Sequence, residues 1–249
     1  MAFINAYDLN KQREYLATAA GIFEDMRKAW TTPCGGIWWD RNQTYVNAIA
    51  NELFLSVAAH LANRDLHKKS YYVHWAEKEW SWFQGSGLIN ARNTINDGLD
   101  NKTCNSNRGT VWSYNQGVLL GGLVELELAT DKGRGYVARA RSIASAAISQ
   151  LTRNGILHEP CENAAQGGNS CGADGPQFKG IFVRNLRKLH AYSPDEKYKA
   201  FIKANAHSIW NRDRKGSELG LIWSDFRQPV NASMQSSALD ALVAAVAVA

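Results

Sequence analysis

The side chains best suited to chemistry in this sequence gather in four regions rich in Gly, Trp, amides and carboxylates. They are residues 34–40 (CGGIWWD); 95–100 (INDGLD) with 112–117 (WSYNQG); 159–162 (EPCE) with 171–180 (CGADGPQFKG); and 221–225 (LIWSD) with 235–237 (QSS). Amides and carboxylates beside aromatic rings suit sugar hydroxyls, which need several donors and acceptors at once. Aromatic faces also pack on the C–H faces of sugar rings. Helix capping, by Asn115 or Asp174 for example, uses the same side chains and is the competing interpretation.

The elements that must position these regions are helices. Short polar turns (residues 9–13, 63–67, 130–134 and 193–197) each precede an amphipathic segment that begins at a tyrosine: Tyr15, Tyr72, Tyr136 and Tyr198. The interval of about 60 residues is typical of a helical hairpin with its loops. More apolar segments at 46–61, 116–128 and 178–189 lie upstream of three of the turns, and a fourth occupies 234–248. We expect these to be inner helices buried on both sides, and the tyrosine-initiated helices to be outer ones.

Alternating inner and outer helices predict an all-α fold, an (α/α)6-type toroid of helical hairpins, with no competing strand periodicity. The inner helices then direct their N-termini to one rim, where the chemically rich regions enter them. The length fits a single domain over residues 1–249. Residues 1–8 resemble the tail of an inner helix, so we expect the toroid to lack its first hairpins.

Composition narrows the function classes. The 28 basic and 23 acidic residues are scattered along the chain, which disfavours nucleic acid as a partner. The apolar run at 241–249 is too short to span a membrane, and no leader peptide is visible.

The cysteines indicate an oxidising compartment. None of the four has zinc-site spacing, and three Asn-X-Ser/Thr triplets begin at Asn42, Asn101 and Asn231. An even cysteine number with such triplets favours a secreted protein that passes through an oxidising compartment. Cys161 and Cys171 are close enough to bridge a Gly-rich loop, which leaves Cys34 to pair with Cys104.

Several segments together resemble glycoside hydrolase family 76, the endo-α-1,6-mannanase family: GGIWWD with YVNAIANELF, INDGLD, WSYNQGVLLGGLVEL, EPCE with CGADGPQFKGIFVR, and QSSALDAL. The resemblance covers essentially the whole chain, in the same order. It implies an (α/α)6 fold and retaining hydrolysis of α-1,6-mannan, or mannosyl transfer, without a metal or organic cofactor. The implied partner is α-1,6-mannan or another mannose-containing glycan.

The catalytic residues implied by the resemblance are two adjacent aspartates, since a retaining glycosidase needs a nucleophile and an acid/base. In the family they precede a sequence similar to residues 6–9 (AYDL), and no Asp-Asp pair occurs in the 249 residues. We therefore expect the pair upstream of Met1 and little hydrolysis by this chain alone. Asp97, in an NDGL setting that the family shares, is the alternative acid and otherwise binds a mannose hydroxyl or tunes the pair.

The resemblance also implies the residues that line the cleft. They are Trp39, Asn47, Asp97, Tyr114, Asn115, Gln116, Gln177, Lys179 and Arg184. The two aromatic residues would stack on mannose rings, and the four amides would bind hydroxyls. Lys179 or Arg184 would hold a site carboxylate ionised, although Arg184 could instead belong to a buried structural ion pair.

Two other functions compete with hydrolysis. A non-catalytic protein that binds mannan would keep the Trp-rich loops but show no turnover. An α/α toroid for isoprenoid substrates, or a scaffold, is disfavoured because metal-dependent terpenoid cyclases need an Asp-rich DDxxD helix, which the sequence lacks.

Overall fold

A computed structural model describes residues 1–130, 134–163 and 171–249. The described part contains nine α-helices: α1 (Ala2–Asn10), α2 (Arg13–Arg27), α3 (Ala48–Ala62), α4 (Lys69–Gly85), α5 (Ser113–Ala129), α6 (Tyr136–Gln150), α7 (Phe178–Tyr192), α8 (Glu196–Arg212) and α9 (Ala232–Ala247). Two short antiparallel hairpins accompany them: β1 (Thr152–Arg153) with β2 (Ile156–Leu157), and β3 (Arg214–Lys215) with β4 (Glu218–Leu219). Turns of 3₁₀-helix lie at Leu66–Lys68, Pro160–Glu162 and Gly175–Gln177.

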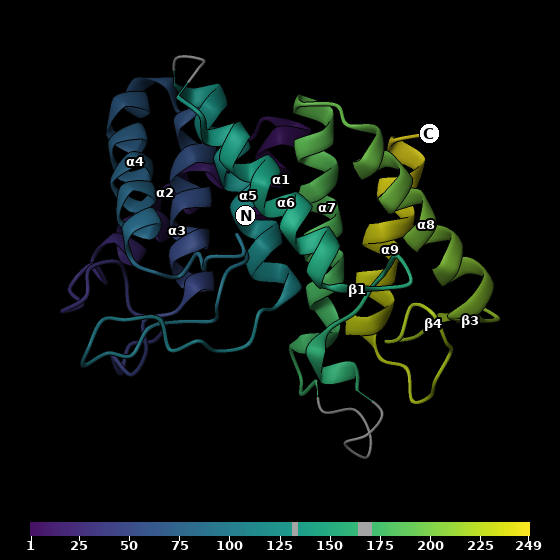
Figure 1. The fold of residues 1–249 in the computed structure, drawn as a ribbon. Helices are drawn as coiled ribbons and strands as arrows, with labels where there is room; N and C mark the ends of the chain where they lie inside the picture. The colour runs from purple at the N-terminus through teal and green to yellow at the C-terminus, as the bar shows by residue number, and fades with distance from the viewer. Residues whose placement is uncertain (131–133, 164–170) are drawn as a thin grey trace.

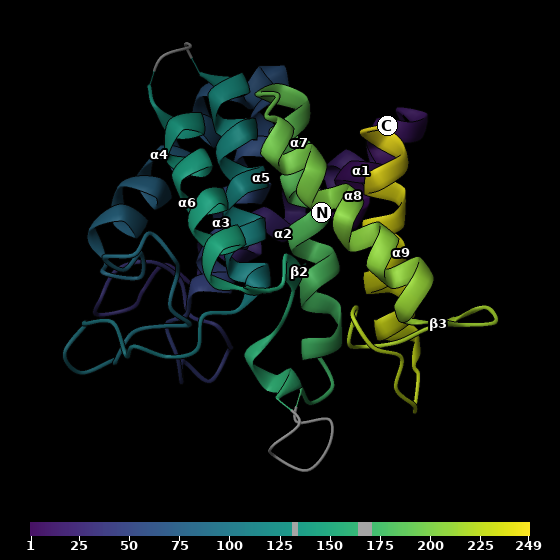
Figure 2. The ribbon, with the colours of Figure 1, turned by 45° about the vertical axis from the view of Figure 1, so that its right-hand side comes forward.

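The helices form two layers (Figure 1). The inner helices α3, α5, α7 and α9 pack side by side in chain order, and each of α4, α6 and α8 contacts two successive inner helices. Figure 2 shows the described parts of the long connections at the lower end of the helices, while the described short turns lie at the other end. This arrangement confirms the predicted all-α toroid of helical hairpins.

The predicted helices are confirmed with small shifts of their ends. Tyr136 is the first residue of α6, whereas Tyr15, Tyr72 and Tyr198 lie in the third or fourth position of their helices. The polar turn predicted at 130–134 lies largely outside the described residues.

Burial differs among the four inner helices. Nearly every residue of α5 is buried, and α3 is buried on both sides beyond its first turn. The same expectation is wrong for α9, where Leu239, Val243 and Val246 are exposed. The described partners of α9 are mainly α7, α8 and the turn before α7, which cover only one of its faces.

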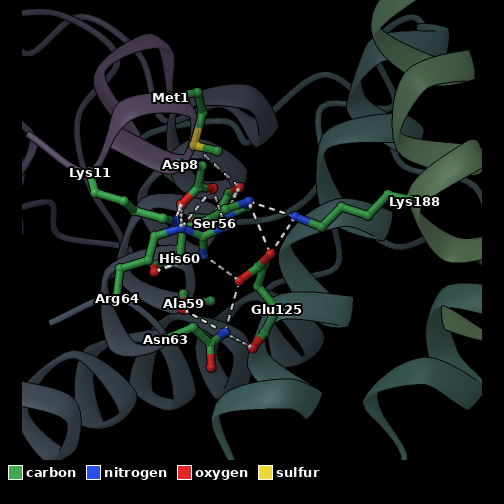
Figure 3. Close-up of polar contacts among 10 residues, drawn as sticks. All are labelled: Met1, Asp8, Lys11, Ser56, Ala59, His60, Asn63, Arg64, Glu125 and Lys188. Carbon is green, nitrogen blue, oxygen red and sulfur yellow. Dashed lines mark hydrogen bonds and ion pairs between the residues drawn. The ribbon is translucent and has the colours of Figure 1, made fainter. Parts of the chain in front are cut away.

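The end of the bundle with the short turns is held by a charged network between inner helices (Figure 3). Glu125 on α5 accepts from Arg64 at 2.8 Å and from Lys188 on α7 at 2.6 Å. Arg64 also binds Asp8 on α1 at 2.7 Å. His60 on α3 faces Lys188 through Nε2 at 2.7 Å. Because Glu125 is only 6 % exposed, these contacts compensate a carboxylate that burial would otherwise penalise.

Both predicted disulfides are present. Cys34–Cys104 ties the connection before α3 to the connection before α5, and Cys161–Cys171 joins two cysteines with a sequence separation of 10. The Gly-rich segment within that loop lies mostly outside the described residues. Across the described ranges, no helix is long and apolar enough to cross a membrane.

Gly117 permits the close approach of α5 and α7, and we expect Gly117→Ala to destabilise the protein. A Cβ at this position would lie 2.5 Å from Phe182 Cα, which belongs to the backbone of α7. Forcing two packed helices apart costs about 1–3 kcal/mol, measurable by urea unfolding. The matched control is Gly21→Ala on α2, where a Cβ meets nothing within 4 Å. It should stabilise by about 0.5–1 kcal/mol, and equal effects at the two sites would contradict the packing explanation.

Candidate functional site

The predicted site regions lie together at the end of the bundle where the inner helices begin. The connections at 28–47, 86–112, 151–177 and 213–231 lead into α3, α5, α7 and α9 respectively. In both ribbon views the described parts of these connections lie at the lower end of the helices (Figures 1 and 2). This end also presents the free N–H groups of the helix N-termini.

Asp97 is held at the start of α3. The hydroxyl of Tyr45 donates to Asp97 Oδ2 at 2.7 Å, and the Asn107 amide donates to the same hydroxyl at 2.7 Å. The backbone of this segment pairs with the residues just before α3, with Ala48 N donating to Asp97 O at 2.8 Å. Burial, then the hydrogen bond and charge of Asp97, raise the pKa of Tyr45. The phenol therefore stays protonated and keeps donating to Asp97.

Gly98 makes this approach possible. A Cβ on Gly98 would lie 2.2 Å from the Tyr45 hydroxyl oxygen, so any side chain there would separate Tyr45 from Asp97. The close approach of Tyr45 thus explains why a glycine occupies this position of the NDGL segment.

Tyr114 lies at the start of α5 among acidic groups. Burial raises its pKa most, followed by the negative charges of Asp97 and Glu52. Its ring stacks on Phe178 of α7, with centroids 3.8 Å apart and planes 13° from parallel. One ring face is thus already covered by protein, and only the opposite face and the hydroxyl remain for the predicted contact with a sugar.

Asp97, Tyr45 and Tyr114 together form what we call the cluster around Asp97. Two buried glutamates accompany this cluster, and neither was among the predicted site residues. Glu52 on α3 is fully buried with no hydrogen-bond partner among the described residues, and burial followed by the charge of Asp97 raises its pKa well above the usual value. Glu159 is also fully buried and accepts hydrogen bonds from the backbone N–H and the hydroxyl of Ser113. Burial raises the pKa of Glu159 to about 7. The sequence signal for Glu52 was an acidic residue within the otherwise apolar segment 46–61.

Three other predicted residues lie at the same end of the bundle. Their side chains make no contact with the described residues that would compete with a ligand. Trp39 is 57 % exposed, and its backbone N–H donates to Tyr45 O. Gln177 is exposed beside Phe178 and makes no capping hydrogen bond. Asn115 is fully buried, and neither atom of its amide has a partner among the described residues. Such an amide calls for water or a ligand, because an unpaired buried amide is costly.

Two predicted amides serve the fold instead of a ligand. The side chain of Asn47 caps α3 by accepting from Ala50 N at 3.2 Å, so the capping interpretation fits this residue. Gln116 is fully buried, and its amide binds the backbone of Ile95 in both directions as well as Trp112 O. Gln116 therefore holds the segment that carries Asp97, and its predicted contact with a sugar hydroxyl stays a prediction that these bonds do not favour.

The two predicted cations differ in environment. Lys179 is 1 % exposed and lies 2.5 Å from Glu162 Oε1 and 2.6 Å from Leu221 O. Burial does not favour its direct contact with a sugar, and the carboxylate it pairs with is Glu162, which is not part of the cluster around Asp97. Arg184, two turns from the start of α7, pairs with Asp240 at 3.1 Å, and its side chain is 53 % exposed. This pair is structural but not buried, and it lies beyond the cluster around Asp97.

The arrangement is suited to binding neutral hydroxyls. Asp97 presents a carboxylate fixed by a phenol, and Tyr114 presents a protonated hydroxyl with an aromatic ring. Glu52 and Glu159 are shielded from solvent, and the burial that raises their pKa values favours their uncharged forms. Within the described residues, no group of three or more His, Cys, Asp or Glu side chains could hold a metal ion.

Comparison with known proteins points in the same direction. The family model of glycosyl hydrolase family 76 matches residues 1–248. The mannan endo-1,6-alpha-mannosidase DCW1 of Candida albicans is 29% identical over 91% of this chain and 52% of its own length. The mannan endo-1,6-alpha-mannosidase DFG5 of Saccharomyces cerevisiae is 28% identical over 84% of this chain and 48% of its own length. The chain thus spans about half the length of these curated relatives.

Solved structures share the fold. The α-1,6-mannanase of Salegentibacter sp. HEL1_6 superposes with a TM-score of 0.87 at 25% identity, covering 100% of this chain and 73% of its own. An inactive variant of that mannanase, with two neighbouring aspartates replaced by asparagine, was solved with α-1,6-mannotriose. Dfg5 from Chaetomium thermophilum, at a TM-score of 0.81 and 23% identity, shares the fold over 94% of this chain.

Proposed function

Because the chain belongs to glycosyl hydrolase family 76, we propose that it forms the mannan-binding part of an enzyme that hydrolyses α-1,6-linked mannan. The cluster of Asp97, Tyr45 and Tyr114 at the loop end carries this proposal. It combines a fixed hydrogen-bond acceptor, a phenolic donor and aromatic surface, the set of groups that a mannose unit requires. The Salegentibacter mannanase, which has the same fold, supports the choice of α-1,6-mannan as the ligand.

Residues 1–249 act as one domain in this proposal. The support is the family match over nearly the whole chain and the continuous packing of successive inner helices. Trp39 and Gln177 extend the cluster toward further mannose units, since they are exposed on the connections beside it. Asn115 lies in the first turn of α5, where its amide is fully buried and has no partner among the described residues.

Retaining hydrolysis needs a nucleophile and an acid/base within reach of one glycosidic bond. Of the carboxyl groups in the described cluster, Glu52 and Glu159 are fully buried, and Asp97 is engaged by Tyr45. This observation favours binding without turnover by these residues alone. Incubation with α-1,6-mannan should then release little product, and turnover by the 249 residues would assign the chemistry to Asp97.

Binding of α-1,6-mannotriose tests the proposal, and we expect Asp97→Ala to weaken it about 10-fold or more. A hydrogen bond to a charged group contributes about 1.5–3 kcal/mol, which corresponds to roughly 10–100-fold in the dissociation constant. Isothermal titration calorimetry measures the change.

The matched control is Asp100→Ala, three residues along the same loop, where the exposed carboxylate binds only its own turn through Lys102 and Thr103. The dissociation constant of the Asp100→Ala variant for α-1,6-mannotriose should remain within about twofold of that of the unchanged protein. If the Asp97→Ala variant binds α-1,6-mannotriose as tightly as the unchanged protein, the mannan site lies elsewhere.

The compartment is part of the same proposal. Two disulfides support a secreted or cell-wall protein, since disulfides persist in oxidising environments. Among the sequons, Asn42 is exposed, whereas Asn101 uses its amide to bind Thr44 O and Val46 N. Glycosylation at Asn42 is therefore favoured over glycosylation at Asn101.

A further inference from the structure

Asn107 lies beside the loop segment that carries Asp97. Its backbone N–H donates to Gly98 O at 2.9 Å, and the Asn96 side chain donates to Gly109 O at 2.7 Å. These two bonds hold the two segments of the loop together. The Asn107 side chain therefore stays close to Asp97 although it is exposed.

The orientation of the Asn107 amide is fixed by a backbone group. Gly109 N–H donates to Asn107 Oδ1 at 2.7 Å, and a backbone N–H can only donate, so the atom that it meets must be the amide oxygen. The amide nitrogen then points to Tyr45, 2.7 Å from its hydroxyl oxygen. Because an amide nitrogen only donates, the Tyr45 oxygen accepts there, and the hydroxyl proton is left for another partner.

That partner is Asp97, whose Oδ2 accepts from the Tyr45 hydroxyl at 2.7 Å. The donors therefore all point the same way along this chain of hydrogen bonds, toward the carboxylate. The second oxygen, Asp97 Oδ1, has no hydrogen bond to the described residues, and packing does not close it off from solvent as it does the carboxylate oxygens of Glu52. One oxygen of Asp97 is thus bound to the protein, and the other is available to a ligand.

We propose that Asn107 is a positioning residue of the candidate mannan site, which directs the Tyr45 proton to Asp97 Oδ2 and so leaves Oδ1 turned to the sugar. This inference rests on the proposed function, since it takes α-1,6-mannan as the ligand of Asp97. It adds a requirement on the substrate: the group that meets Oδ1 is an O–H donor, because a carboxylate oxygen only accepts hydrogen bonds. Asn107 acts through Tyr45 and is not itself a catalytic residue.

Asn107→Asp tests the direction of these hydrogen bonds, because it changes the amide nitrogen to an oxygen of similar size. The new carboxylate still accepts from Gly109 N–H but cannot donate near neutral pH. The Tyr45 proton then has two competing acceptors, and Asp97 loses its constant donor. We expect the dissociation constant for α-1,6-mannotriose to rise about fivefold, from the loss of roughly one hydrogen bond, as measured by isothermal titration calorimetry.

The matched control for the added charge is Asn105→Asp. Asn105 lies on the same segment and is exposed, and its side chain has no hydrogen bond to the described residues. The variant adds the same negative charge without a contact to Tyr45, so its dissociation constant for α-1,6-mannotriose should stay within about twofold of that of the unchanged protein.

A double-mutant cycle shows whether Asn107 acts through the phenol. Tyr45→Phe removes the hydroxyl, and we expect it to weaken α-1,6-mannotriose binding about fivefold as well. In the Tyr45→Phe background, Asn107→Asp should change the dissociation constant by less than about twofold. A merely structural role of Asn107 would instead give the same loss in both backgrounds.

The inference is overturned by unchanged affinity in Asn107→Asp, by an equal loss in Asn105→Asp, or by a loss in Asn107→Asp that persists in the Tyr45→Phe background. Asp97→Ala distinguishes these results from a failure of the proposed function. If Asp97→Ala still weakens binding about 10-fold or more, the mannan site stands and only the role of Asn107 fails. If Asp97→Ala binds as tightly as the unchanged protein, the proposed function fails and this inference fails with it.

Discussion

Replacing Lys179 by methionine is expected to lower the free energy of unfolding by about 3–5 kcal/mol, because it leaves Glu162 buried without its cation. Both side chains are 1 % exposed, and the ammonium group also binds Leu221 O and lies over Trp223. Methionine keeps much of the side-chain volume, so the loss reports the missing charge and hydrogen bonds. Urea unfolding followed by tryptophan fluorescence measures the change.

The same helix offers a matched control in Arg184→Met. Arg184 also forms an ion pair, with Asp240, but its side chain is 53 % exposed. Exposed pairs contribute at most about 1 kcal/mol, so this variant should lose less than that amount. Similar losses at the two positions would show that burial of the Lys179 pair does not decide its contribution.

The second large effect is expected at the other end of the bundle, where Glu125→Gln should remove stability that depends on pH. Burial opposes ionisation of Glu125, but nearby positive charges outweigh it and hold its pKa at about 2. His60 has a pKa of about 3 and is uncharged near neutral pH, so Lys188 and Arg64 supply the attraction there. A depressed carboxyl pKa stabilises the folded state above pH 4.5, and the gain disappears as pH falls toward 2.

The expected loss in the Glu125→Gln variant is up to about 3 kcal/mol at pH 7, from 1.36 kcal/mol per pKa unit. It should shrink steadily as the pH is lowered from about 4.5 to about 2, when the wild-type carboxylate is protonated as well. Urea unfolding at several pH values in this range measures it. A loss independent of pH would mean that the carboxylate charge contributes nothing and that only the shape of the side chain matters.

A surface carboxylate provides the comparison for this network. Glu77 on α4 binds Arg134 at 3.0 Å, with the arginine 54 % exposed. Glu77→Gln should cost less than about 1 kcal/mol. The contrast with Glu125 isolates what burial between three inner helices adds to an ion pair (Figure 3).

Much of the fold followed from local patterns. The apolar segments at 46–61 and 116–128 became α3 and α5, because an all-round apolar helix has to be covered on every side. The short polar turns indicated where an inner helix ends and the next outer helix begins. Since the regions that enter the inner helices share one end of a toroid, the sequence also located Asp97 and Tyr114 at that end.

The use of individual side chains could not be predicted in the same way. Gln116 was expected to bind a sugar, yet its amide binds the backbone of Ile95, 21 residues away. Lys179 was expected in the cleft, yet it is buried against Leu221 O, 42 residues away. An amide or an ammonium group makes the same kinds of bond to a ligand and to the protein, so residue type alone does not distinguish them.

Burial determined the remaining properties of the candidate site. Packing removed Glu52 and Glu159 from water and so raised their pKa values, which favours uncharged carboxyl groups beside the candidate site. The sequence by itself determined the helical hairpins, the two disulfides and the end of the bundle at which the site forms, since these depend on periodicity and spacing. The tertiary structure decided which polar groups stay without a partner among the described residues and which support the fold, because desolvation and partners distant in sequence exist only after the helices have packed.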